Sequence, residues 1–282
     1  LRIPNINMND GPQGFRSQKY PGTSTAFPSL LNLGATWDDK LCYDYGQAMG
    51  KEFYYKGANV ALGPGMNINR VPLNGRNFEY ISGGDPYLGS KLVSPVIKGI
   101  QSPPYNMIAN AKHWVNNNQE TDRMSTNAIV DERTRYEFYY QPFSSAIDSD
   151  VGSVMCSYNR INGKWACENP ETLRGDLKSG KRNSDNDNDS DSDKRYGLGF
   201  EGWVMSDWTA THSLSIEQGL DQEMPGHKYF GTKLINAVQN SEISIDTVNE
   251  SVLRILTVMY KAGLINDANS NSNSKPNTNT NT

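Results

Sequence analysis

The sequence predicts an α/β domain built as a (β/α)8 TIM-like barrel, and three observations lead to this prediction. Strand and helix patterns alternate through most of the 282-residue chain, which is typical of a parallel sheet covered by helices. Neither a G-x-G-x-x-G fingerprint after the first strand nor a P-loop occurs, and this disfavours a dinucleotide-binding fold. Polar residues follow several predicted strands, which is where such a barrel carries its active site.

The first predicted elements are a helix over residues 38–56 and a strand over 58–63. Leu41, Tyr45 and Ala48 recur at helical spacing in the first segment. The second segment reads ANVALG, a short apolar run of the kind that forms a buried strand.

The middle of the chain predicts two further helices with a strand between them. Residues 87–101 place apolar side chains on one helical face, although Pro95 lies inside this segment. The run NMIANA predicts a strand over 106–111, and a helix is expected over 131–148.

The last part of the chain predicts three strands and a closing helix. Strands are expected over 151–155 and 202–206, with a further one over 219–224. The helix over 246–262 has a regular apolar face, and Gly263 suits its C-terminal end.

Two polar segments stand outside this pattern. Residues 178–195 form an acidic, Asn-rich insert that is expected to be a solvated loop, and residues 265–282 read as a linker or tail. The predicted barrel domain therefore occupies residues 1–264. The sequence begins with Leu1 and not with Met, and its start has no charged segment followed by an apolar one. We therefore interpret the chain as a processed or truncated piece.

Composition narrows the classes of function. The chain has 27 Lys and Arg against 31 Asp and Glu, a net charge of −4, and no basic block, which argues against nucleic acid and anionic membranes as partners. A mean hydropathy of −0.68 without a long apolar run argues against a membrane span. The three cysteines and three histidines lack the spacing of a zinc site, and no metal or cofactor is expected.

Charged, aromatic and hydroxyl side chains follow the predicted strands. Together they predict one cleft at the C-terminal face of the barrel, with stacking surfaces and charged donors suited to a polyhydroxylated ligand. Asp207 also has a structural interpretation as the N-cap of a helix over 209–217. The residues are Arg70, Arg76, Glu79, Lys112, His113, Cys156, Ser157, Tyr158, Asp207 and Trp208.

Five segments carry a family resemblance. In chain order they are VPLNGRNFEYISGGDPYLG, ANAKHWVNNNQETDR, VMCSYNRING, GFEGWVMSDWTATHS and GLDQEMPG. They resemble the N-terminal barrel domain of family 3 glycoside hydrolases, especially eukaryotic β-glucosidases, over residues 10–264. The resemblance implies that the barrel lacks its first strand–helix unit and that a C-terminal α/β domain belongs to the full-length protein.

The resemblance also implies a retaining β-glucosidase that cleaves terminal β-glucosyl residues of cellobiose-like oligosaccharides, with Asp207 as the nucleophile. Asp10 in NDGPQG favours glucose over xylose as the bound sugar. The acid/base is expected from the second domain, because Glu79, Glu120 and Glu201 do not match that role. The residues expected to surround the sugar are Asp10, Arg16, Arg76, Lys112, His113, Met155, Tyr158 and Trp208.

The cysteines and the N-glycosylation sequons give information on the localisation of the protein. The resemblance implies a disulfide between Cys156 and Cys167, against the alternative of two buried thiols, while Cys42 is expected to be free. Asn188 and Asn249 begin N-x-S glycosylation sequons. Together with the resemblance, these features indicate a secreted glycoprotein.

Two other functions stay open at this point. The chain could be a non-catalytic sugar-binding remnant or an inactive truncated barrel. It could also be an aldolase that forms a Schiff base on Lys112, although no phosphate-binding loop supports that reading.

Overall fold

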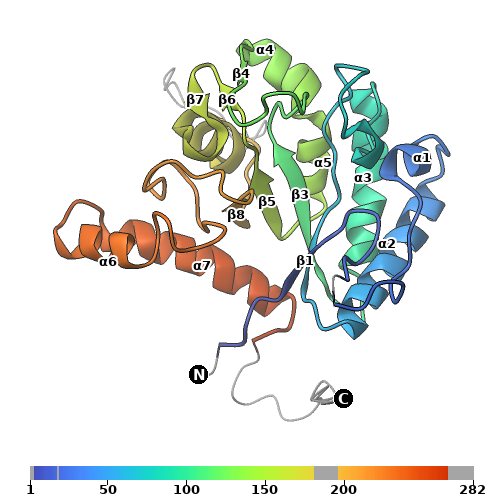
Figure 1. Cartoon of the computed structure of the whole chain (residues 1–282), viewed down its shortest axis with the longest axis horizontal. Helices are drawn as coiled ribbons and strands as arrows, with labels where there is room; N and C mark the ends of the chain where they lie inside the picture. Colours follow the sequence, from blue (N-terminus) through green and yellow to red (C-terminus); the bar gives the residue numbers. More distant parts are fainter. Residues whose placement is uncertain (1–2, 18, 181–195, 266–282) are drawn as a thin grey trace, which may run out of the picture.

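The computed structural model describes residues 3–17, 19–180 and 196–265 (Figure 1). Most of the acidic insert and nearly all of the predicted tail lie outside these ranges, as does the Asn188 sequon.

A five-stranded parallel sheet forms the centre of the described chain. Its strand order is β1-β2-β3-β5-β8, and the two outer strands do not pair with each other. The sheet is curled and incomplete, which confirms the predicted barrel class and the implied loss of a strand–helix unit. The strands are β1 (Met8–Asp10), β2 (Val60–Leu62), β3 (Ile108–Trp114), β5 (Ser153–Cys156) and β8 (Trp203–Ser206).

Three helices cover the outer face of the sheet: α2 (Asp39–Tyr55), α3 (Pro86–Ile100) and α5 (Gln141–Asp148). Asp38 begins α2 by accepting a hydrogen bond from the Leu41 amide (2.9 Å). The predicted segments around α2 and α3 are confirmed. The third is broken, because α4 (Glu132–Thr134) and a π-helical turn precede α5.

The inner face of the sheet carries a separate apolar cluster. Because side chains alternate along a strand, Val60, Ile108 and Met155 point away from the outer helices and into this cluster. Helix α7 (Ile245–Lys261) packs there through Val258 and confirms the predicted closing helix. Figure 1 shows α7 on the opposite side of the sheet from α2, α3 and α5.

Gly152 permits the close approach of α7. A Cβ atom at this position would lie 2.7 Å from Ile108 Cγ2 and 2.8 Å from Val258 Cγ1, both closer than real carbon contacts. A larger residue at position 152 would therefore push α7 off the inner face, and the open barrel would lose the element that closes its core.

Several short elements were not predicted. They lie in the segments between the strands of the central sheet and after its last strand. They are α1 (Leu30–Gly34), α6 (Thr232–Gln239), β4 (Asn127–Ala128), β6 (Arg160–Ile161), β7 (Lys164–Trp165), the 3₁₀ turns Asn77–Glu79 and Ala166–Glu168, and the π-helical segment Glu171–Lys178. The π-helical turn inside the predicted helix over 131–148 is Arg135–Tyr139.

Two strand predictions need correction. The predicted strand over 219–224 is wrong, because only Gln222 bridges to Met205, while the Asp221 side chain accepts from the Val204 amide (2.7 Å). The Asp221 carboxylate thus accepts the Val204 amide hydrogen bond that a backbone carbonyl would accept in a regular sheet. Strand β3 runs three residues beyond its predicted end, so Lys112 and His113 lie within the strand and not after it.

A disulfide joins the end of β5 to a nearby turn. Cys156 and Cys167 are bonded, with Cα atoms 5.2 Å apart, so the implied pairing is confirmed. Cys42 is free and buried in α2. None of the helices in the described ranges combines the length and apolar character that a bilayer crossing requires.

Thiol counting checks the disulfide in solution. The denatured, unreduced chain should show one free thiol, from Cys42, and three after reduction. Replacing both bridged cysteines by serine should lower the free energy of unfolding by about 2–4 kcal/mol, because the bridge restricts the unfolded chain. Three thiols before reduction would contradict the bridge.

Candidate active site

A cleft of about 930 Å³ opens at the carboxyl ends of the strands. Asp10 is the last residue of β1 and Leu62 the last of β2, while Tyr158 and Asp207 follow β5 and β8. The nine residues expected to bind or attack the sugar all line this cleft, as does Glu79. The nine are Asp10, Arg16, Arg76, Lys112, His113, Met155, Tyr158, Asp207 and Trp208.

The prediction of Arg70, Cys156 and Ser157 for the cleft is wrong. Cys156 is in a disulfide, and the Ser157 hydroxyl donates to the Val115 carbonyl.

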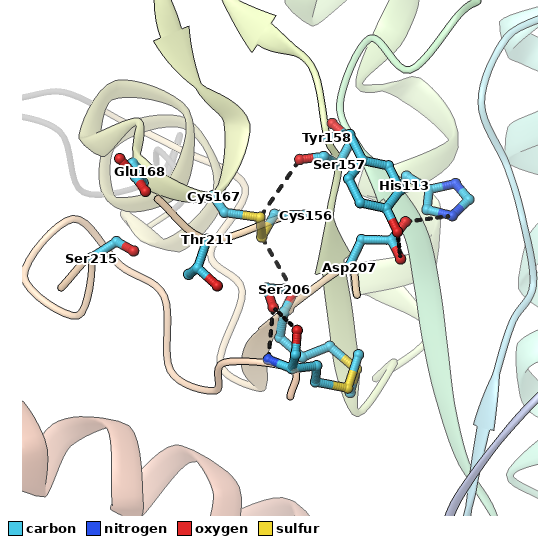
Figure 2. The surroundings of a disulfide bond; sticks show 12 residues. His113, Cys156, Ser157, Tyr158, Cys167, Glu168, Ser206, Asp207, Thr211 and Ser215 are labelled. Carbon is cyan, nitrogen blue, oxygen red and sulfur yellow. Dashed lines mark hydrogen bonds and ion pairs between the residues drawn. A yellow bond between two sulfur atoms is a disulfide. The ribbon is translucent and has the colours of Figure 1, made fainter. Parts of the chain in front are cut away.

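The Asp207 carboxylate is held by one of its two oxygens. Oδ1 accepts hydrogen bonds from the Tyr158 hydroxyl (2.8 Å) and from the Trp208 amide (2.7 Å). Oδ2 lies 3.5 Å from His113 Nε2, and the side chain is 14% exposed (Figure 2). The residues after Asp207 form turns and no helix, so its structural interpretation as an N-cap is wrong.

Tyr158 is kept protonated by its surroundings. Burial and the adjacent Asp207 carboxylate raise the pKa of its phenol, so it stays a hydrogen-bond donor at neutral pH. The guanidinium carbon of Arg123 lies 4.5 Å from the ring centroid of Tyr158, and Arg123 also pairs with Glu120 (3.0 Å). Arg123 therefore supports the ring from the cleft side.

Asp10 lies between two cations that also line the cleft. Its oxygens lie 3.3 Å from Lys112 Nζ and 3.0 Å from Arg16 Nη1. Burial acts to raise the pKa of Asp10, but the charges of Lys112 and Arg16 outweigh burial and hold the pKa below its ordinary value. The result is an ionised carboxylate facing the cleft.

Arg76 connects the rim to the buried strand β3. Its Nε donates to Glu79, and its Nη2 lies 3.2 Å from His113 Nε2. Burial, followed by the charges of Arg76 and Lys112, lowers the pKa of His113 well below the ordinary histidine value, so the imidazole is neutral.

The walls of the cleft differ in exposure. Met155 belongs to the buried inner cluster, whereas Trp208 is 61% exposed and offers its indole face at the rim. Phe78, Arg123 and Met224 line the cleft but were not predicted. Arg123 lies in the segment ANAKHWVNNNQETDR, so the sequence did contain a signal for it.

The remaining alternatives find little support in the geometry. Lys112 is engaged by Asp10, which is not the arrangement of an uncharged amine ready to form a Schiff base. Within the described ranges, no group of three or more His, Cys, Asp or Glu side chains could hold a metal ion.

The comparison with protein families identifies the domain. The glycosyl hydrolase family 3 N-terminal domain matches residues 1–258. The chain belongs to glycoside hydrolase family 3. Its parallel sheet, with a polar cleft at the carboxyl ends of the strands, is therefore the N-terminal barrel of that family.

Named relatives of this family 3 chain are β-glucosidases. "Probable beta-glucosidase A" of Aspergillus terreus is 39% identical and "Thermostable beta-glucosidase B" of Acetivibrio thermocellus 38% identical, each over 93% of this chain. The chain covers 30% and 34% of these two proteins, so it spans about a third of their length.

Solved structures give the same result. A β-glucosidase of Streptomyces venezuelae in complex with D-glucose superimposes with a TM-score of 0.80 at 38% identity, over 93% of this chain and 33% of that one. The β-D-glucoside glucohydrolase of Trichoderma reesei gives 0.82 at 37% identity, over 92% and 35%.

Proposed function

We propose that this family 3 barrel is the nucleophile-bearing part of a retaining β-glucosidase. The observation that carries the proposal is the Asp207 carboxylate, which lines the cleft and is held at Oδ1 by Tyr158 and the Trp208 amide, so that Oδ2 accepts from neither. The β-glucosidase relatives support the choice of sugar. A sugar-binding barrel without turnover is the alternative.

The chemistry follows from this arrangement. A retaining glycosidase attacks the anomeric carbon with a carboxylate and forms a glycosyl-enzyme, which water later hydrolyses. Asp207 Oδ2 would form the bond to the sugar as the aglycone oxygen leaves with the bonding pair. Tyr158 would keep the carboxylate oriented throughout, since its own proton stays on the phenol.

The other polar groups would bind the hydroxyls of the sugar. Asp10 and Lys112 present a fixed negative and a fixed positive charge side by side, and charge-assisted hydrogen bonds to a diol are strong and directional. Arg16 and Arg76 extend this arrangement, and the exposed Trp208 indole would support the face of a sugar ring.

The second carboxylate of the reaction is proposed to come from the C-terminal domain of the full-length protein. Asp10 is ionised between two cations and Glu79 is engaged by Arg76, so neither suits a proton donor. We also propose secretion and glycosylation. Asn249, the acceptor of the second sequon, is exposed on α7, so its side chain is accessible to a glycan.

A burst experiment tests the proposed function. Mixing the chain with a dinitrophenyl β-glucoside should release one equivalent of dinitrophenol per protein, because glucosyl transfer to Asp207 precedes slow hydrolysis. The corresponding α-glucoside should give no burst, and the β-xyloside a slower one. Absence of a burst on folded protein would favour the sugar-binding alternative.

A further inference from the structure

Both ring nitrogens of His113 contact polar groups whose hydrogen-bonding roles can be worked out. His113 lies in β3 and is 1% exposed. Its Nε2 lies 3.2 Å from Arg76 Nη2 and 3.5 Å from Asp207 Oδ2, while its Nδ1 lies 3.2 Å from the Tyr80 hydroxyl. A neutral imidazole carries one proton, so only one of the two nitrogens can donate.

Arg76 decides which nitrogen carries the proton. A guanidinium has only donors, so the contact with His113 Nε2 is a hydrogen bond only when Nε2 offers its lone pair. A proton on Nε2 would oppose two N–H groups at 3.2 Å. The Tyr80 hydroxyl imposes no such choice, because a hydroxyl accepts as readily as it donates.

We infer that Arg76 holds His113 as the tautomer protonated on Nδ1, and that Tyr80 is a positioning residue whose hydroxyl oxygen accepts the hydrogen bond from this N–H. Asn117 Nδ2 also donates to the Tyr80 hydroxyl oxygen (3.4 Å), which fits an oxygen that acts here as an acceptor. Tyr80 is fully buried and its pKa is raised, chiefly by burial, so the phenol remains neutral beside His113.

This tautomer changes what the cleft offers to a ligand. The single lone pair of His113 Nε2 accepts from Arg76, so His113 offers a ligand no donor at this edge, whereas the neighbouring Lys112 donates. His113 also gives no proton to Asp207 Oδ2, and among the described residues no other donor contacts that oxygen. The statement about Asp207 as a nucleophile rests on the proposed function. The tautomer of His113 rests only on its contacts with Arg76 and Tyr80.

Nitrogen-15 NMR of the 282-residue chain, with labelled histidine, tests the inference directly. A His113→Gln variant assigns the His113 signals against those of His212 and His227. The unsubstituted protein should show a protonated Nδ1 and an unprotonated Nε2, without titration between pH 5.5 and 8, a range that brackets the ordinary histidine pKa of about 6.5. A protonated Nε2 would overturn the inference whatever the outcome of the burst experiment.

Three variants separate the roles of the neighbours. Arg76→Met should move the proton to Nε2, because the fixed donor is gone and the Tyr80 hydroxyl can then donate to Nδ1. Tyr80→Phe should keep the proton on Nδ1 but speed its exchange with solvent, because its acceptor is lost. Tyr158→Phe, which alters the Asp207 contact only, should leave the His113 signals in the same tautomer.

The outcomes are distinguishable from those of the proposed function. Retention of the Nδ1 proton in folded Arg76→Met would show that Arg76 does not hold the tautomer, and unchanged exchange in Tyr80→Phe would remove Tyr80 from its role. A protein with the expected tautomer but no burst would keep this inference and lose the β-glucosidase proposal.

Discussion

A 2-deoxy-2-fluoro β-glucoside with an activated leaving group is expected to attach one sugar to Asp207. The fluorine slows both steps, and the good leaving group restores the first, so the glycosyl-enzyme accumulates. Intact mass spectrometry should show a single addition, and peptide mapping should place it on the peptide that contains Asp207. The reason is geometric: Asp207 lines the cleft, and Tyr158 and the Trp208 amide hold its Oδ1 and leave Oδ2 for the attack.

The matched control is Asp207→Asn. The amide keeps the size of the side chain but is a poor nucleophile, so labelling and the dinitrophenol burst should fall by about 10⁴-fold or more. Asp10→Asn should still be labelled at the same residue, at a higher sugar concentration, because Asp10 is proposed to bind and not to attack. A label on Asp10 or Glu79 would refute the assignment of the nucleophile.

Cellobiose should be hydrolysed at a negligible rate by this chain, even where the dinitrophenyl glucoside reacts. A sugar alkoxide is a poor leaving group and needs protonation, which typically contributes 10²–10⁴-fold. The cleft carboxylates other than Asp207 are Asp10 and Glu79, and both are engaged by cations. Glucose release can be followed by a coupled assay over hours.

Azide gives the complementary result. As an anion it needs no general base, so it should accelerate turnover of the dinitrophenyl glucoside and release β-glucosyl azide. An α-azide would contradict a retaining mechanism. Rapid turnover of cellobiose would show that an acid/base lies among these 282 residues and that its identification has been missed.

Much of the site could be predicted from the sequence, because strand ends can be read from short apolar runs. VGSVM and GWVMS each lead directly into polar residues, and the structure places Tyr158 and Asp207 on one cleft. Contacts between distant segments could not be predicted this way. Arg123 reaches Tyr158 through a long loop whose path no local pattern specifies.

The errors in the fold have similar causes. Strand β1 has three residues, Met8–Asp10, and no alternation of apolar and polar side chains, so only its pairing with β2 reveals it. The predicted strand over 219–224 failed because Asp221 uses its side chain as well as its backbone to bind Val204. Local propensity does not show which polar groups will replace a ladder bond.

The buried imidazole of His113 couples the stability of the barrel to protons. Its pKa is well below the ordinary value of about 6.5, so below that pH the unfolded chain binds a proton that the folded chain rejects. The free energy of unfolding should then fall with decreasing pH, by up to about 1.4 kcal/mol per pH unit from this residue. Asp10, whose pKa is lowered, adds its own loss only at more acidic pH, below about 4. Urea unfolding at pH 7.5, 6.5 and 5.5 measures the slope, and a slope unchanged in His113→Gln would contradict this coupling. Burial of His113 is the main cause of its lowered pKa, so the acid sensitivity of the barrel follows from the exclusion of water around this one side chain.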